Sequence, residues 1–561
     1  MARSGDFLHG RVPHAAQREK FLLSRPAVID VRKRCIMSES FVLKGNIWTG
    51  DSGKPYVEAL RVSGGKVLQT GSVSEIVPSA GEKVYDYGRC LVTPGFTDAH
   101  LHFGAYARAG IYPDCGSAES LEDLLDFLRG QVKDAGAGRW VRCINFIELN
   151  WKHPAVPTRL QLDRIAPDTP LVVSHYGAHM HIANTAAFKS AGLWDSSDPE
   201  IERGSDGLPT GKLFDSGADA MIRAIQAQHE TDAALTAFFE KALHKLTSLG
   251  LTALHACDAP TYALGERPDL MQNLDAGGRM PMHVFFYHDR LPDFKVRSQR
   301  NFKSGHLAYA GLKVFADGSL GARTAALSRP YSDEPGESGH LIHTDEQMIS
   351  LFRAAQMRGI QVQTHAIGDA ACEQVVRCVE AVQKELGRPE APYRLNHAIV
   401  LGEGMPERIA RAGIVVDLQP IQIWDDRNMA PLRLGPRLFR MAYQLRRLAD
   451  AGILLTGSSD APCDDPNPWY GIGVAATHLG LDGSVPEGHD TAQKLTLDEA
   501  LRLYTVNPWK AMAFDGPAAG TLVPGAPADI AVADRDVFKA APAEICQVKN
   551  QATFFEGEKV F

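Results

Sequence analysis

The stretch IQVQTHA, residues 360–366, contains the pattern from which the fold is predicted. It is a short apolar run that ends at a histidine, and a helix-compatible stretch follows it. The middle of the chain repeats this arrangement in PLVVSH (170–175), LTALHA (251–256), MHVFFYH (282–288), AGLKVFADG (310–318), YRLNHAIV (393–400), IVVDLQP (414–420) and ILLTGSSD (453–460). A strand followed by a helix, repeated about eight times, indicates a parallel sheet and favours an α/β fold of the distorted (β/α)8 TIM barrel type.

The helix-compatible stretches carry recognisable start signals. Residues 344–359 and 496–514 each begin with a threonine followed by acidic residues, and their apolar positions recur with a helical period. We expect the barrel to occupy residues 93–515. That length exceeds the size of a simple barrel, so we expect insertions near 104–170 and 191–230.

Both ends of the chain differ from this middle. Residues 41–92 and 516–561 contain short runs rich in Val, Leu and Ile between Gly-containing turns, as in small antiparallel sheets. We therefore predict that the two ends pair into one composite β-sandwich domain. Residues 1–40 are predicted to be a disordered N-terminal extension. They lack the apolar centre of a secretory signal, and an upstream start site or a targeting sequence remains open.

Composition excludes several classes of partner. The formal net charge of -8 provides no basic excess for binding nucleic acid. No run approaches the roughly 18 to 20 apolar residues of a membrane helix, so we expect no membrane partner. The nine cysteines are scattered without a Cys-x-x-Cys pair, which favours reduced thiols and a cytoplasmic location.

Residues that can bind metals recur where the apolar runs end. In VTPGFTDAHLHFG (92–104), two histidines stand at positions i and i+2, so both would point to one face of a strand. Such a pair alone is weak evidence for a metal site, because a buried histidine is often an ordinary core residue. In the same way, Asp460 alone could be the N-cap of a helix. The full set is His100, His102, His255, Lys313, His365, His397 and Asp460. In a barrel, this end of the strands is where catalytic groups converge.

Lys313 requires a separate explanation, because burying a charged lysine in an apolar strand costs several kcal/mol unless it is paired. A lysine with a lowered pKa can react with CO₂ and become a carbamate that bridges two divalent ions. His100, His102 and Asp460 would then bind one ion, and His365 and His397 the other. Nitrogen and oxygen ligands suit zinc, with manganese or iron as alternatives.

The sequence resembles the amidohydrolase superfamily, and within it the YtcJ-like group (amidohydrolase family 3) that includes N-substituted formamide deformylases. The segments that carry this resemblance are TPGFTDAHLHFG (93–104), GLKVFADGSLGARTAAL (311–327), SGHLIHTDEQM (338–348), HAIGDAA (365–371), RLNHA (394–398), LQP (418–420), GSSDAPCDDPNPW (457–469) and GTLVPGAPADIAV (520–532). The resemblance implies metal ligands at His100, His102, carboxylated Lys313, His365, His397 and Asp460. It also implies that Asp460 is the catalytic base and then the acid of an amide hydrolysis.

Substrate-binding residues are implied less specifically. GAHMHIAN (177–184) resembles a family segment His-x-x-Trp-x-Asn, which makes His179 and Asn184 candidates to face the substrate, although Ile182 replaces the tryptophan. After Lys313, Asp317 and Arg323 are further candidates, and Arg323 would bind a substrate carboxylate or form a structural salt bridge.

Three functions remain after these observations. The first is hydrolysis of a non-peptide C–N bond in a small linear amide or formamide. The second is cyclic amide hydrolysis or deamination, but a deaminase would carry His-x-x-Glu where this chain has HAIGD (365–369). The third is a non-catalytic metal-binding paralogue. A homodimer is compatible with the resemblance.

Overall fold

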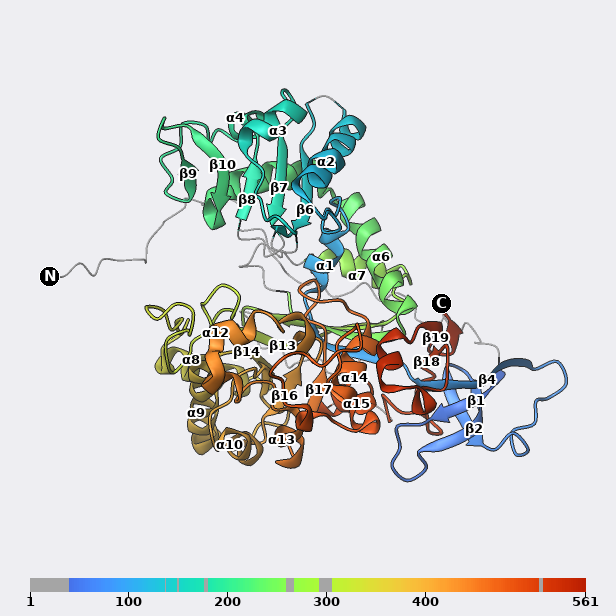
Figure 1. Cartoon of the computed structure of the whole chain (residues 1–561). Coiled ribbons are helices and arrows are strands. Elements are labelled where there is room, and N and C mark those ends of the chain that lie inside the picture. Colours follow the sequence, from blue (N-terminus) through green and yellow to red (C-terminus); the bar gives the residue numbers. More distant parts are fainter. Residues whose placement is uncertain are drawn as a thin grey trace.

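The computed structural model describes residues 40–136, 138–148, 151–175, 180–258, 267–291, 305–513 and 518–561. Within these residues the strands form sheets of eight, seven and five strands (Figure 1). In this part of the chain, no helix is both long enough and apolar enough to span a lipid bilayer.

The eight-stranded sheet is parallel and nearly closed, which confirms the predicted barrel. Its order is β17-β16-β15-β14-β13-β12-β11-β5. The strands are β5 (Phe96–Leu101), β11 (Leu251–Ala256), β12 (His283–His288), β13 (Leu307–Phe315), β14 (Gln361–Ala366), β15 (Arg394–His397), β16 (Val415–Leu418) and β17 (Leu455–Gly457). Backbone hydrogen bonds complete the ring beyond β17, because the Asp460 N–H donates to the His100 carbonyl (2.9 Å) and the His102 N–H to the Ala461 carbonyl (2.8 Å).

Helices follow the barrel strands and pack around the barrel. They are α1 (Phe103–Ala109), α6 (Asp232–Ser248), α7 (Pro268–Ala276), α8 (Asp345–Gln356), α9 (Asp369–Leu386), α10 (Met405–Ala412), α11 (Gln422–Asp425), α12 (Ala430–Phe439), α13 (Leu445–Asp450), α14 (Pro468–Thr477), α15 (Leu497–Leu503) and α16 (Val506–Ala511). Both predicted helix starts are confirmed. Thr344 and Thr496 each form a capping box, which satisfies backbone N–H groups that the first helical turn leaves unpaired.

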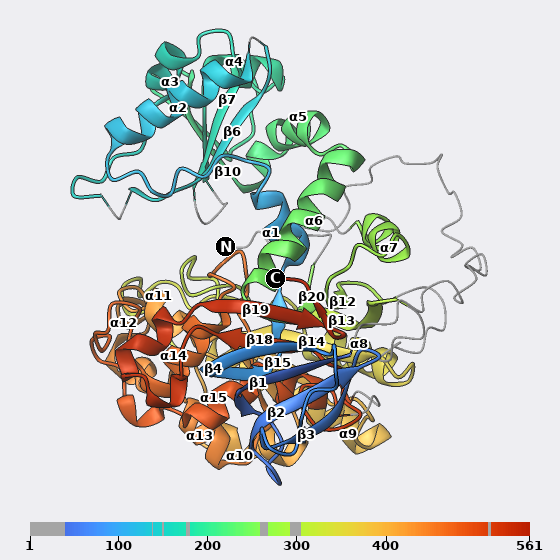
Figure 2. The same cartoon turned by 90° about the vertical axis from the view of Figure 1, so that its right-hand side faces the viewer.

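The seven-stranded sheet contains both ends of the described chain, as predicted (Figure 2). Its strands are β1 (Phe41–Trp48), β2 (Tyr56–Ser63), β3 (Lys66–Gly71), β4 (Lys83–Pro94), β18 (Ile530–Ala533), β19 (Asn550–Phe555) and β20 (Glu558–Lys559). The long strand β4 pairs with β1 on one side and with β18 on the other. Phe41, Leu43, Val92 and Phe554 form part of its buried core, and each such side chain contributes about 1.5–3 kcal/mol on burial.

The five-stranded sheet corrects one sequence-based expectation. It consists of β6 (Val141–Phe146), β7 (Leu171–His175), β8 (Met180–Ala183), β9 (Ile201–Arg203) and β10 (Pro209–Phe214). The run PLVVSH therefore supplies β7 of this sheet, and β5 provides the eighth barrel strand instead. The apolar residues of β7 are buried on both faces, which is the pattern of a barrel strand.

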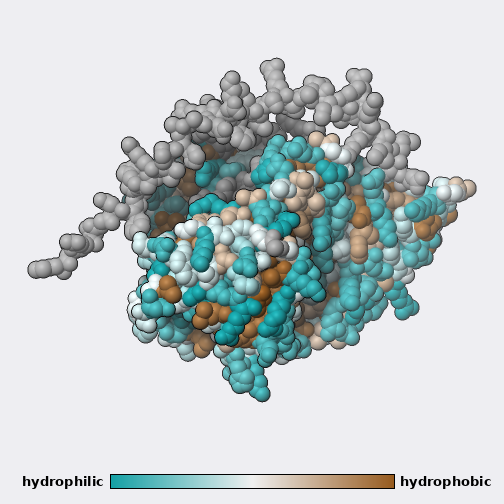
Figure 3. Space-filling view, turned by 90° about the horizontal axis from the view of Figure 1, so that it is seen from above, coloured by the Kyte–Doolittle hydropathy of each residue, from teal (hydrophilic) through white to brown (hydrophobic). Residues whose placement is uncertain are grey.

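This sheet and its helices form a subdomain above the barrel, joined to it through α1 and α6 (Figure 1). The helices are α2 (Leu121–Ala135), α3 (Arg159–Ile165), α4 (Thr185–Ser190) and α5 (Asp219–His229). Both stretches predicted to be insertions contribute to it. Seen from above, the molecular surface is mainly hydrophilic, with apolar side chains in small separate areas (Figure 3). The remaining short helices are 3-10 turns at Asp215–Ala218, Thr491–Gln493, Val537–Lys539 and Pro542–Gln547.

Candidate metal centre

The six predicted ligands meet at the carboxyl ends of the barrel strands. His100 and Lys313 lie on β5 and β13, and His365 and His397 on β14 and β15. His102 directly follows β5, and Asp460 lies in the loop after β17. The ring of His100 lies 5.3 Å from that of His397, and the His365 and His397 rings are 4.4 Å apart, measured between centroids. The closed ring of parallel strands thus brings together residues that are far apart in the sequence.

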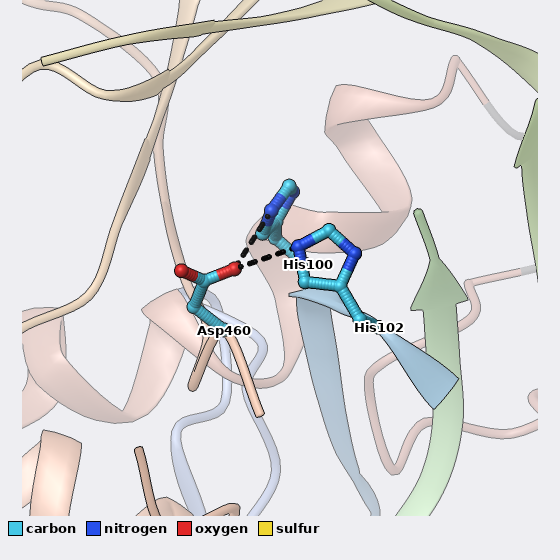
Figure 4. Close-up of side chains that lie close together, drawn as sticks. All are labelled: His100, His102 and Asp460. Atoms are coloured by element: carbon cyan, nitrogen blue, oxygen red, sulfur yellow. Dashed lines mark ion pairs between the residues drawn. The ribbon is translucent and has the colours of Figure 1, made fainter. Parts of the chain in front are cut away.

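One carboxylate oxygen of Asp460 faces both His100 and His102 (Figure 4). Its Oδ1 is 3.1 Å from His100 Nε2 and 3.3 Å from His102 Nε2. Among the described residues, these three are the one group whose possible ligand atoms all lie within 4.8 Å of one another. Burial alone would raise the pKa of Asp460, but its bonds to the two histidines hold that pKa well below the usual value.

Lys313 lies beside this group with 1% of its surface exposed. Its Nζ is 3.2 Å from His100 Nε2 and donates to Asn396 Oδ1 at 2.9 Å. Burial lowers the pKa of Lys313 to about 8. A larger fraction of neutral amine is therefore present near neutral pH than for an exposed lysine, and only the neutral amine can form a carbamate.

Of the two remaining histidines, His397 is buried and His365 is partly buried, and both have lowered pKa values. Burial, with the nearby Lys313, lowers the pKa of His365 to about 4. Burial also holds the pKa of His397 well below its usual value. His365 Nε2 lies 3.1 Å from the Gly318 carbonyl, which can only accept, so Nε2 carries the proton and Nδ1 keeps its lone pair. His397 Nε2 is buried without a hydrogen-bond partner in the described part of the chain.

These donors fit a divalent metal ion. Imidazole nitrogens, a carboxylate and a lysine that can become a carbamate are the ligand types that zinc accepts. Two of the residues also have strained backbones. His397 (φ 72°) and Asp460 (φ 60°) adopt left-handed conformations that non-glycine residues rarely take, at a cost of about 1–3 kcal/mol each. Such strain is typical of functional sites.

The other candidates take different places. His255 is buried and its Nδ1 accepts from Arg394 at 2.9 Å, which keeps it outside the six-residue cluster. Asp317 lies close to the site: it is 3.5 Å from His365 Nε2, and its carboxylate accepts the N–H groups of Ile367 and Gly368. Burial raises the pKa of Asp317 to about 7. This carboxylate ties the loops after β13 and β14 together.

Arg323 forms a salt bridge with Asp333 at 2.9 Å, the structural alternative considered for it. Asn184 lies in the five-stranded subdomain. Its Oδ1 accepts the Leu171 and Ala187 N–H groups, and its Nδ2 donates to two carbonyls. The side chain therefore caps α4, and all of its hydrogen-bonding groups have partners within the subdomain. His179 lies outside the described residues.

Polar residues that the sequence did not predict contact the candidate ligands. Asp98 accepts the His100 N–H at 3.1 Å, and Gln363 Oε1 lies 3.4 Å from His100 Nδ1. Gln419 contacts His397 in the same way. A signal was present, because Asp98 and Gln363 each stand two residues before a candidate ligand in an apolar strand and so share its face.

Comparison with known proteins agrees with this geometry. Residues 83–561 match the family described as "Amidohydrolase family". The chain is 30% identical over 516 residues to "Putative amidohydrolase YtcJ" of Bacillus subtilis, which covers 90% of this chain and 96% of that one. It is 27% identical to "N-substituted formamide deformylase" of Arthrobacter pascens, over 93% and 98% of the two chains. The crystal structure of an uncharacterized metal-dependent hydrolase from Pyrococcus furiosus superposes with a TM-score of 0.71 at 26% identity, over 89% and 99% of the chains.

Proposed function

This chain belongs to the amidohydrolase family, and we propose that it hydrolyses a non-peptide carbon–nitrogen bond of a small linear amide or formamide. The observation that carries the proposal is the convergence of His100, His102 and Asp460 within 4.8 Å, beside the buried Lys313. The similarity to an N-substituted formamide deformylase supports the formamide class of substrate.

The metal would be held by the cluster at the strand ends, with zinc as the expected ion and manganese or iron as alternatives. The proposed ligands are His100, His102, Lys313, His365, His397 and Asp460. When bound, a divalent ion supplies hydroxide near neutral pH by lowering the pKa of a water molecule from 15.7 to about 7.

Asp460 is proposed to transfer the proton. Its carboxylate is ionised at neutral pH, because its contacts with His100 and His102 keep its pKa low. It can therefore accept a proton from the attacking water and return it to the leaving nitrogen. The products are a carboxylic acid, or formic acid, and an amine.

We also propose that Lys313 is carboxylated in the active protein. The neutral Nζ attacks the carbon of CO₂, a nitrogen–carbon bond forms while one carbon–oxygen π bond opens onto oxygen, and one amine proton leaves to solvent, so the neutral amine becomes an anionic carbamate. Asn396 Oδ1, which accepts from Nζ, can also accept the remaining N–H of the carbamate.

Lys313→Ala should lower kcat/KM by at least about 100-fold, because the site loses a metal ligand and its support. Short carboxylates such as acetate should restore part of the activity by entering the space that the side chain leaves. Lys313→Met is the matched control: it should be equally inactive but resistant to rescue, since its side chain fills that space. Rescue by methylamine in place of acetate would contradict the carbamate.

The test of the function as a whole is a substrate panel with metal removal. We expect about one to two divalent ions per chain, and hydrolysis of N-formyl and N-acyl amines that stops after chelation and returns with zinc. Metal removal should also lower the melting temperature, because an ion that binds only the folded state stabilises it. Full activity in metal-free protein would refute the proposal. Ammonia release or ring opening of cyclic imides would favour the alternative activities.

A further inference from the structure

The ring of His397 contacts the side chain of Gln419, a residue that was not among those predicted for the metal centre. His397 is the last residue of β15, and both His397 and Ala398 have positive φ angles, of 72° and 49°. This turn directs the chain away from the strand, and the Ala398 N–H donates to the Ala366 carbonyl at 3.0 Å. Gln419, which follows β16, places its Oε1 2.8 Å from His397 Nδ1 and is 5% exposed.

The hydrogen bonds behind Gln419 run in one direction. Ser458, which follows β17, donates its single hydroxyl proton to the Leu418 carbonyl at 3.1 Å. Its Oγ can therefore only accept from Gln419, whose Nε2 lies 2.8 Å away. The NH₂ group of Gln419 is thus directed towards Ser458, and its carbonyl oxygen is directed towards His397.

This direction determines which nitrogen of His397 carries the proton. A carbonyl oxygen can only accept, so Nδ1 must be the protonated nitrogen. Nε2 then keeps its lone pair, and it is the atom that is buried without a hydrogen-bond partner among the described residues. His102 differs, because its Nδ1 has no hydrogen-bond partner among those residues.

We propose that Gln419 is a positioning residue that fixes the tautomer and ring orientation of His397 and thereby controls how tightly the centre retains its metal. This inference rests on the proposed function, since it takes His397 to be a metal ligand. Partners of this kind typically change metal affinity by about 10–100-fold. Three successive strand ends supply the chain of bonds, through His397, Gln419 and Ser458.

A small cavity beside His397 and Gln419 determines which substitution of Gln419 tests the proposal best. Its volume is about 10 Å³, and Gln422, Tyr443 and Gln444 are among the residues that line it, together with His397 and Gln419. That volume is at the lower limit for one water molecule. Shortening Gln419 to alanine would enlarge the cavity and admit water, which could replace the lost acceptor. Gln419→Met keeps the volume and removes the acceptor.

The experiment measures zinc affinity by competition with a chelator of known affinity. Wild type is measured first, and absence of zinc binding there would refute the proposed function itself. Gln419→Met should then raise the apparent Kd for zinc by about 10–100-fold. Gln419→Glu, which keeps an acceptor facing Nδ1, should remain within a few fold of wild type.

Two further variants separate positioning from a structural role. Gln422→Met changes another glutamine that lines the same cavity but bonds to Asp464 rather than to a ligand, so it should bind zinc as wild type does. Ser458→Ala leaves Gln419 in place but removes the bond that orients its amide, so zinc affinity should fall in the same direction by a smaller factor. The melting temperatures of the metal-free variants show, independently of zinc binding, whether each variant is folded. Wild-type zinc affinity in both Gln419→Met and Ser458→Ala would overturn the proposal.

Discussion

Asp460→Asn is expected to lower kcat by about 10²–10⁴-fold, the range for loss of a positioned general acid–base. Asparagine keeps the size of the side chain but cannot accept the proton that the proposed reaction moves. It is also the substitution best matched to the backbone, because Asp460 has a φ of 60° and asparagine tolerates this conformation better than alanine does. Lost activity would then reflect chemistry rather than a distorted loop.

The measurement combines steady-state kinetics with metal analysis of the same sample. The control is Asp465→Asn, which changes an exposed carboxylate in the same loop whose oxygen accepts the Asn467 N–H, a bond that asparagine can keep. The control should stay within about twofold of wild type, as is usual for surface substitutions. Wild-type turnover in metal-loaded Asp460→Asn would exclude the proton-transfer role. Inactivity with an empty site would instead point to Asp460 as a ligand only.

The sequence was sufficient to predict where the candidate ligands meet, because that depends only on strand order. Each of His100, Lys313, His365 and His397 ends or lies near the end of an apolar run, and parallel strands in a barrel place such ends on one face. Their convergence therefore followed from the fold class. The run that became β7 was misassigned for the complementary reason: a strand buried on both faces looks alike in a barrel and in a covered sheet.

The supporting contacts were not predictable in the same way. Gln419 reaches His397 from the end of the neighbouring strand, and Asn396 on β15 reaches Lys313 on β13 across β14, so these pairs depend on the register between strands. Register is set by the packing of whole faces, which no single run reveals. Asn184 illustrates the opposite case, in which a motif position was recognised but the residue serves a local helix cap.

The same dependence on register explains the buried ion pair below the site. Arg394 and Asp417 lie on the paired strands β15 and β16, and both side chains are fully buried. Arg394 NH2 is 2.7 Å from Asp417 Oδ1. The guanidinium also donates to the Tyr287 hydroxyl at 3.1 Å and to the Ala99 carbonyl at 3.0 Å. Each charge is therefore matched inside the barrel.

Asp417→Asn is expected to destabilise the protein by about 3–5 kcal/mol, because it leaves the Arg394 guanidinium buried without a counter-charge. A urea unfolding curve monitored by tryptophan fluorescence should move to a lower midpoint. The matched control is Asp345→Asn, which breaks a pair with Arg377 at 2.8 Å on the surface. Solvent screens that pair, so the control should cost at most about 1 kcal/mol.

The effect of Asp417→Asn should extend to the metal centre, which distinguishes it from a general loss of stability. Asp417 accepts from Asn396 Nδ2, and this bond directs Asn396 Oδ1 towards Lys313. In Asp417→Asn, the Asn396 amide loses this charged acceptor and is left with Gln363 Oε1 at 3.0 Å, so it is held less firmly and activity should fall even under conditions where the variant is fully folded. Replacing both charges, as in Arg394→Leu with Asp417→Leu, should recover stability because no unpaired charge remains. Activity should stay low in the double variant, since Asn396 Nδ2 still lacks the Asp417 carboxylate and is held by Gln363 Oε1 without it. If Asp417→Asn and Asp345→Asn lowered the free energy of unfolding equally, burial would not be the reason that the Arg394–Asp417 pair stabilises the protein.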